Sequence, residues 1–134
     1  METNRKYSCL LCKRMMYRVA ERLAEQFRAE GIVTGEAIGE QASQTLTNLR
    51  VLDAAVKDYP VHRPLLGFDK AETEALARKI GTYKFSSKKA GACTAVPYKP
   101  STKAKLEEVI KAEEKLDIEV MVTRSLETIK IIEL

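Results

Sequence analysis

The feature that most constrains this 134-residue chain is an alternation of helix-period segments with short apolar runs. Apolar residues recur at helical spacing with charged residues on the opposite side, which predicts four helices. The first predicted helix spans 10–29, with Gly31 as its stop signal, and the second spans 41–57. The third is capped by Asp69 and stopped by Gly81, and the fourth starts at Ser101 or Thr102. The predicted strands are 32–34, 60–66, and two terminal strands around Val120 and Val122 and around Ile129 and Ile131.

Helices that alternate with strands favour an α/β fold, in which a parallel sheet is flanked by helices. Ligands bind such sheets beyond the carboxyl ends of the strands, so the loops at Gly35 and Leu66 are candidate site loops. The length fits a single domain over 1–134. A complete nucleotide-binding sheet normally begins with a strand and a phosphate loop, whereas this chain begins with a helix. We therefore expect another segment to complete the domain.

Composition narrows the class of protein. With 45% hydrophobic residues, 31% charged residues, 4 Pro and 6 Gly, the chain is neither disordered nor collagen-like. No apolar run approaches the roughly 20 residues that cross a bilayer, and the N-terminus lacks the pattern of a signal peptide. We expect a cytoplasmic protein without a membrane partner, whose three cysteines are thiols or metal ligands rather than disulfides.

The basic residues are segregated along the chain, although the net charge is only +4. The segment 3–20 has five basic residues and no acid, and it contains Cys9 and Cys12. The segment 84–105 has six lysines and no acid, and it contains Cys93. A shared positive field attracts phosphate backbones and lowers thiol pKa values, which suits nucleic acid binding and thiolate chemistry. Two solvated basic faces are the alternative interpretation.

Cys9 and Cys12 form the pair CLLC at the start of the first predicted helix. Two residues three apart share one helix face and can bind a single metal. The pair alone is compatible with a redox couple, half of a zinc site, part of an iron-sulfur site, or two small packed residues. Zinc would need a further ligand, for which His62, the one histidine, is the candidate. Three thiolates on an iron-sulfur cluster would leave one iron open to another ligand.

Cys93 lies in KKAGACTAVPYKP, with lysines on both sides. Such a setting favours a thiolate that acts as a nucleophile or a metal ligand, and an ordinary surface cysteine is the alternative.

The loop TGEAIGEQASQTLTNL contains Gly35 and Gly39 before a helix start. Its backbone amides can approach a phosphate or a ribose, but an ordinary strand-to-helix turn has the same pattern.

Four ordered blocks together carry a specific resemblance: CLLCKRMMYRVAERLA, VTGEAIGEQASQTLTNLRVLD, HRPLLGFDKAETEALARKIGTY, and the Cys93 loop ending in KPSTKAKLEEVIKAEEKLD. The chain resembles the thiamine-biosynthesis type of tRNA 4-thiouridine sulfurtransferase up to about Asp117. The resemblance implies part of a PP-loop ATPase domain, of the adenine-nucleotide alpha-hydrolase-like fold. Enzymes of this type adenylate a uridine in tRNA, and sulfur then replaces the activated oxygen. They also supply sulfur for the thiazole of thiamine.

The resemblance assigns roles to individual residues. It implies that Lys13, Gly35 and Gln44 contact ATP and that Cys93 is the catalytic, sulfur-handling cysteine. Family members with CxxC before RMM are implied to hold an iron-sulfur cluster with that pair and the later cysteine, which here are Cys9, Cys12 and Cys93. Members without CxxC use a disulfide to a rhodanese domain, and no such domain occurs here.

Two departures from the family pattern limit what this chain can do alone. It has no SGGxDS-like phosphate loop and none of the family's RNA-binding N-terminal modules. In addition, the usual Gly-Gln pair after TGE appears as Gly39-Glu40, with Gln41 one place later.

We therefore predict the C-terminal half of a PP-loop sulfurtransferase domain. Its expected partners are tRNA, a sulfur donor, and either a separate chain with the phosphate loop or another copy in a homo-oligomer. The alternatives are a non-catalytic tRNA- or metal-binding module and a structural zinc protein.

Overall fold

The computed structural model describes residues 5–88, 91 and 93–132. The chain opens with a 3-10 turn, η1 (Arg5–Tyr7), that runs directly into the longest helix, α1 (Ser8–Phe27). The helix ends at Phe27, two residues before the predicted boundary at 29, because Arg28, rather than Gly31, adopts the left-handed conformation and caps α1. Among the described residues, no helix is both long and apolar enough to cross a membrane.

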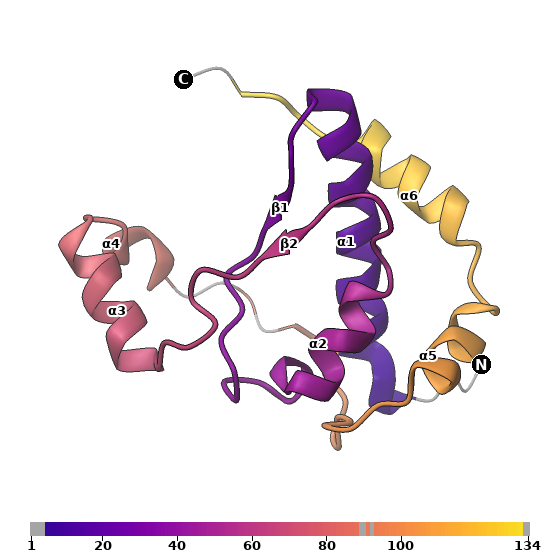
Figure 1. Cartoon of the computed structure of the whole chain (residues 1–134), viewed down its shortest axis with the longest axis horizontal. Coiled ribbons are helices and arrows are strands. Elements are labelled where there is room, and N and C mark those ends of the chain that lie inside the picture. Colours follow the sequence, from indigo (N-terminus) through magenta and orange to yellow (C-terminus); the bar gives the residue numbers. More distant parts are fainter. Residues whose placement is uncertain (1–4, 89–90, 92, 133–134) are drawn as a thin grey trace.

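Two short strands form a parallel sheet beside α1, as the alternation of elements predicted (Figure 1). Strand β1 (Ile32–Val33) pairs with β2 (Val61–His62), and Ile32 lies opposite Val61. Gly31 is needed just before β1, because a Cβ there would lie 3.0 Å from the His62 ring.

The segment between the strands returns the chain along α1. After β1 a loop leads into the 3-10 turn η2 (Ala42–Gln44) and then α2 (Leu46–Asp53). Thr45 caps α2 by accepting a hydrogen bond from the Asn48 backbone N–H. Asn48 is fully buried, and its side chain bonds the Ser101 carbonyl and the Ala104 N–H at 2.8 and 2.9 Å. The later part of the chain is thereby tied to α2.

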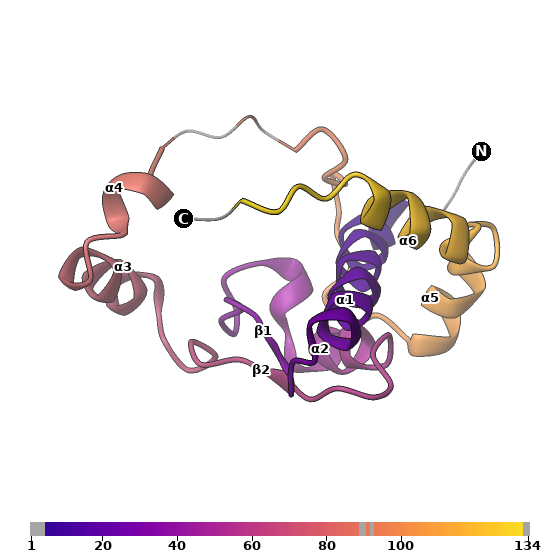
Figure 2. The ribbon, with the colours of Figure 1, turned by 90° about the horizontal axis from the view of Figure 1, so that it is seen from above.

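Helices α5 (Leu106–Glu113) and α6 (Ile118–Glu127) complete the packed part of the molecule. Both lie along α1 on the side away from the helical hairpin of α3 (Lys70–Lys79) and α4 (Tyr83–Ser86) (Figures 1 and 2). One core cluster joins η1, α1, α2 and the region of α5: it comprises Tyr7, Leu10, Tyr17, Leu49, Val51, Leu52, Ala55, Ala104 and Val109.

The prediction of a strand around Val120 and Val122 is wrong. These residues lie in α6, which is capped by the Asp117 side chain and buries Val122. Ile118, Val122 and Leu126 are four residues apart, so packing against α1 overrides the strand preference of β-branched residues. The second expected terminal strand, around Ile129 and Ile131, is also absent from the described residues, where the chain beyond α6 is irregular.

Helix α3 (Lys70–Lys79) begins as predicted from the sequence. Asp69 and Glu72 form a capping box, in which each side chain accepts the other's backbone N–H. After Gly81, which has φ +79°, the short helix α4 (Tyr83–Ser86) packs on α3. The two helices stand apart from α1 (Figures 1 and 2).

Candidate functional site

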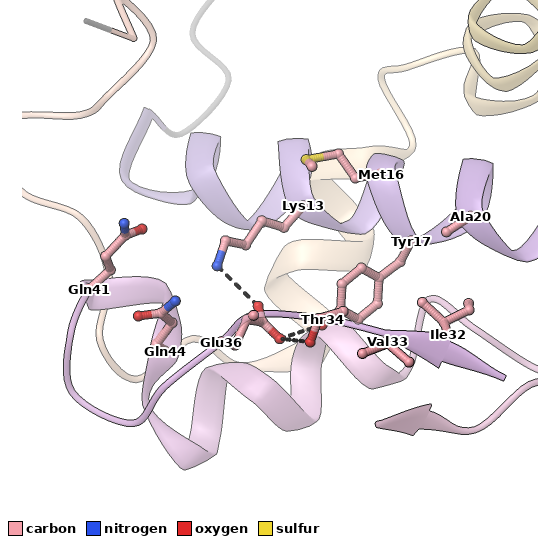
Figure 3. A pocket seen from close by; sticks show the side chains of 11 residues that line it. Lys13, Met16, Tyr17, Ala20, Ile32, Val33, Thr34, Glu36, Gln41 and Gln44 are labelled. Carbon is pink, nitrogen blue, oxygen red and sulfur yellow. Dashed lines mark hydrogen bonds and ion pairs between the residues drawn. The ribbon is translucent and has the colours of Figure 1, made fainter. Parts of the chain in front are cut away.

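A cavity of about 480 Å³ lies between α1, β1 and the loop leading to α2 (Figure 3). One face of α1 forms its wall with residues at helical spacing: Lys13, Met16, Tyr17 and Ala20. The opposite wall follows the chain through and beyond β1: Ile32, Val33, Thr34, Gly35, Glu36, Gln41 and Gln44. The volume falls within the roughly 300–1,000 Å³ typical of small-molecule sites.

The carboxylate of Glu36 organises the polar part of this cavity and is only 5% exposed. Lys13 Nζ lies 3.0 Å from its Oε1, and Arg63 Nε lies 2.9 Å from its Oε2. The Tyr17 hydroxyl donates a hydrogen bond to the same Oε2 (Figure 3). Arg63 in turn donates to the Tyr17 oxygen at 2.9 Å and pairs with Asp53. We call Lys13, Tyr17, Glu36 and Arg63 the Glu36 centre.

These contacts fix the protonation states of the Glu36 centre. Burial would raise the pKa of Glu36, but hydrogen bonds from Tyr17, Arg63 and Lys13 outweigh burial and hold its pKa below the ordinary value. Burial and the hydrogen bond to Glu36 raise the pKa of Tyr17 to about 12. Near neutral pH the centre therefore holds an ionised carboxylate, a neutral phenol and two cations.

Gln44 brings an unused polar atom to the cavity. Its side chain is 8% exposed, and its Oε1 has no hydrogen-bond partner within the described part of the chain. A buried polar atom without a partner is costly unless a ligand or water meets it. Gln44 lines the cavity, so its side-chain amide is a candidate hydrogen-bonding group there.

The three residues predicted as nucleotide contacts come together in the fold. Lys13, Gly35 and Gln44 all line the cavity, although they come from α1, the end of β1 and η2. A Cβ on Gly35 would meet nothing within 4 Å, so its backbone borders open space. Gly39 has φ +84° and serves the turn, whereas Gln41 lines the cavity. The role of Lys13, Gly35 and Gln44 toward a nucleotide stays a prediction.

The cysteines lie at the end of α1 that carries Lys13. Cys9 is half-buried, whereas Cys12 and Cys93 are exposed, and all three are free thiols. Burial raises the pKa of Cys9, and the nearby thiols of Cys93 and Cys12 raise it further, whereas Lys13 lowers it. The expected lowering of thiol pKa values is therefore wrong for Cys9, because burial and neighbouring thiols outweigh the positive field.

The candidate metal ligands are not assembled at ligand distance. Across residues 5–88, 91 and 93–132, no three His, Cys, Asp or Glu side chains are grouped closely enough to hold a metal ion. His62 is exposed on β2 and packs beside Gly31, and it does not join the cysteines in such a group. The set Cys9, Cys12 and Cys93 stays a prediction.

A second buried carboxylate, Glu113, lies at the end of α5. Arg14 and Arg18 each bind it with two hydrogen bonds, at 2.8 and 2.9 Å in both cases. Burial would raise the pKa of Glu113, but the two guanidinium groups lower it to about 2. We call these three residues the Glu113 centre, which fixes α5 on α1.

Comparisons with known proteins show the family of the chain. The family model described as thiamine biosynthesis protein (ThiI) matches residues 1–118. The chain belongs to this family. Its relatives include probable tRNA sulfurtransferases of three archaea. That of Methanosarcina mazei is 45% identical over 133 residues (98% of this chain), that of Saccharolobus islandicus 49% over 110 residues (82%), and that of Methanocaldococcus jannaschii 46% over 112 residues (84%).

A solved structure of a family member extends the likeness to the fold. It is a 4-thiouridine synthetase in complex with RNA and bound ATP, with a TM-score of 0.83 and 37% identity. The match covers 93% of this chain and 33% of that protein. The chain likewise spans about a third of the length of its sequence relatives, 32% for the first and 29% for the other two.

The sequence patterns did not identify three residues of the Glu36 centre as site residues: Tyr17, Glu36 and Arg63. Two signals could have found them. Lys13 and Tyr17 are four residues apart on a predicted helix, and so share a face. Glu36 lies three residues beyond β1 and Arg63 directly follows β2, so both lie near the carboxyl edge of the parallel sheet, where ligand sites are expected.

Proposed function

We propose that this chain is part of a tRNA sulfurtransferase that thiolates an ATP-activated uridine, with the nucleotide held in the cavity beside α1. The observation that carries the proposal is the convergence of Lys13, Gly35 and Gln44 on this cavity. Family membership and the likeness to a synthetase bound to ATP and RNA support it.

Each group suits a nucleotide. Lys13 has three N–H donors, of which one faces Glu36, so others remain available for a phosphate oxygen. The apolar side chains of Met16, Ala20 and Val33 offer a surface for the base or ribose. The unpartnered oxygen of Gln44 can accept a hydrogen bond from a ribose hydroxyl or an exocyclic amine.

The proposed reaction has two steps. The uridine carbonyl oxygen attacks the α-phosphorus of ATP, which forms an adenylated uridine and releases pyrophosphate. A sulfur nucleophile from a donor then attacks the activated carbon, and the carbon–oxygen bond breaks as AMP leaves with the oxygen. Lys13 would stabilise the charge on the transferring phosphate, in the manner of other phosphate-binding cations.

No SGGxDS-like segment occurs in the 134 residues, so we propose that the phosphate loop comes from outside this sequence, in a different chain or in a longer polypeptide. The same protein is a candidate source of sulfur for the thiazole of thiamine, as the family description suggests.

We propose Cys93 as the sulfur-handling residue and Cys9, Cys12 and Cys93 as ligands of an iron-sulfur cluster. The donor set fits in chemistry, since thiolates are the usual ligands of such clusters, and the effect of Cys12 and Cys93 on the pKa of Cys9 supports their proximity. A cluster with one open iron would supply a position for sulfide.

The test of the main proposal combines binding and activity. ATP binding to the chain is measured by calorimetry, and thiolated uridine is then measured in tRNA after coexpression with a phosphate-loop protein. We expect ATP binding that is weakened by Lys13→Gln or Gln44→Leu and unchanged in Lys111→Gln, which changes an exposed lysine on α5. Equal binding by all variants would contradict the nucleotide site.

The cluster needs a separate test, because it can fail while the nucleotide site stands. Anaerobically purified protein is analysed for iron, sulfide and zinc, and its absorption spectrum is recorded. Charge-transfer absorption that disappears in Cys9→Ser, Cys12→Ser and Cys93→Ser would support the cluster. Zinc without sulfide would favour the structural zinc alternative, and thiols without metal would leave Cys93 acting alone.

A further inference from the structure

The hairpin of α3 and α4 carries a surface that no core residue covers. No residue of either helix is buried, and the large apolar side chains of Ile80 and Phe85 are 63% and 62% exposed. The hairpin projects away from α1, α5 and α6 in both views (Figures 1 and 2). We define the hairpin surface as Arg78, Ile80, Tyr83, Lys84, Phe85 and Lys88. Exposed apolar side chains in a cluster indicate an interaction site.

Cations lie over the aromatic rings of this surface. The Arg78 guanidinium lies 3.5 Å from the centroid of the Tyr83 ring. The ammonium groups of Lys84 and Lys88 lie 4.9 and 5.6 Å from the centroid of the Phe85 ring. Rings and cations are thus interleaved within one short hairpin, as in surfaces that bind single-stranded nucleic acid.

The charge around the hairpin surface has one sign. The sequence contains no acid from Ala75 to Leu106. Asp69 and Glu72, at the far end of α3, are engaged in the capping box. Glu74 is the nearest acid before Arg78, and the two side chains approach only to 4.0 Å on an exposed face. Apart from the weak pair of Arg78 with Glu74, the cations next to the rings lie in a stretch of sequence without acids, which favours an anionic partner.

We infer that the hairpin surface binds RNA, with bases stacked on Phe85 and Tyr83 and phosphates on Lys84, Lys88 and Arg78. This inference rests on the proposed function, in which tRNA is the substrate. A protein partner would need both carboxylates for the cations and apolar groups for the rings. Nucleic acid offers phosphates and flat bases in every nucleotide, so it matches the alternating chemistry of this surface.

The test measures the affinity of the whole chain for an unmodified tRNA transcript by fluorescence anisotropy at several salt concentrations. The variants are Phe85→Ala and the double variant Lys84→Gln/Lys88→Gln. The matched controls are Phe27→Ala, which removes a ring 59% exposed at the end of α1, and Lys111→Gln/Lys115→Gln, which removes two exposed lysines beside α6. Circular dichroism verifies that each variant is folded.

We expect Phe85→Ala to weaken binding by about 5- to 100-fold at every salt concentration, because a stacking partner is lost. The double lysine variant should reduce the slope of log affinity against log salt by roughly 1.4 to 1.8, since two phosphate contacts are lost. The controls should match the wild type in affinity and slope.

Three outcomes would overturn the inference. If the wild type binds tRNA and the hairpin variants match their controls, the hairpin surface is not the RNA site, whereas the proposed function stands. If Phe85→Ala instead abolishes self-association or binding to a coexpressed phosphate-loop protein with unchanged tRNA affinity, the surface is a protein interface. If the wild type binds no tRNA, both this inference and the RNA substrate of the proposed function fail, even where ATP binding is intact.

Discussion

The Glu113 centre and the Glu36 centre are two buried carboxylates served by the same helix. Arg14 and Arg18 of α1 face Glu113. Lys13 and Tyr17 of the same helix face Glu36. Each pair is four residues apart, and the two pairs are offset by one residue, which rotates the direction by roughly 100° around the helix. One helical segment, KRMMYR, thus supplies two different centres.

The difference between the centres is in what remains unbound. Both oxygens of Glu113 are occupied by two guanidinium groups in paired hydrogen bonds, and Arg14 is itself 2% exposed. The Glu36 centre borders the cavity, and Lys13 keeps N–H donors available there. A carboxylate saturated by arginine fixes the fold, whereas a carboxylate beside a cavity orients groups for a ligand.

Loss of the Glu113 carboxylate should have the largest effect. Glu113→Ala leaves the buried Arg14 without its partner, so the free energy of unfolding should fall by about 3–5 kcal/mol. Urea denaturation followed by circular dichroism measures the change. The control is Glu114→Ala at the exposed neighbouring position. A loss below about 1 kcal/mol, the range of a surface pair, would remove the distinction between the centres.

Acid should weaken the Glu113 centre over a defined pH range. The pKa of Glu113 is lowered from 4.5 to about 2 in the folded chain, so its stabilisation is complete above pH 4.5 and lost as the pH falls toward 2. The lost contribution is about 3 kcal/mol at 1.36 kcal/mol per pKa unit. The difference in unfolding free energy between wild type and Glu113→Gln should therefore shrink below pH 4.5. A difference that is independent of pH would contradict this assignment.

Removal of the Lys13 ammonium should affect binding more than stability. In Lys13→Gln, the carboxylate of Glu36 keeps Arg63 and Tyr17, so the unfolding free energy should change by less than about 1 kcal/mol. ATP affinity should fall by roughly 10- to 100-fold, since a charged hydrogen bond is lost. Calorimetry measures affinity, with Lys111→Gln as the control. A Lys13→Gln variant that is clearly less stable than the wild type but binds ATP with normal affinity would reverse the roles of the two centres.

Tyr17→Phe should lower stability less than Glu113→Ala does. The variant removes one hydrogen bond to Glu36 and one acceptor for Arg63, which should lower the unfolding free energy by about 1–2 kcal/mol. The matched control is Tyr98→Phe, at a position that is 96% exposed, where no loss of unfolding free energy is expected. A loss as large as that of Glu113→Ala would show that the Glu36 centre also holds the fold together.

Local sequence patterns predicted the helices that are set by interactions between residues close together in the chain. The apolar spacing of α1 predicted that helix, and Asp69 predicted the start of α3, because a cap acts within one turn. The run from Val120 misled the prediction, since β-branched residues favour a strand until a neighbouring helix buries one face. The presence of Lys13, Gly35 and Gln44 on one cavity was anticipated through the family resemblance, not through periodicity.

The sequence by itself determined the order of helices and strands as far as α3, the parallel sheet, the basic segments and the family. Only the tertiary structure decided that Glu36 and Glu113 are the charged centres of the molecule. Their partners come from helices and strands far apart in the chain, and the sequence does not show which of its 19 acids meets which of its 23 lysines and arginines. That choice is made when burial removes water from a few of them, because a buried charge must then be paired.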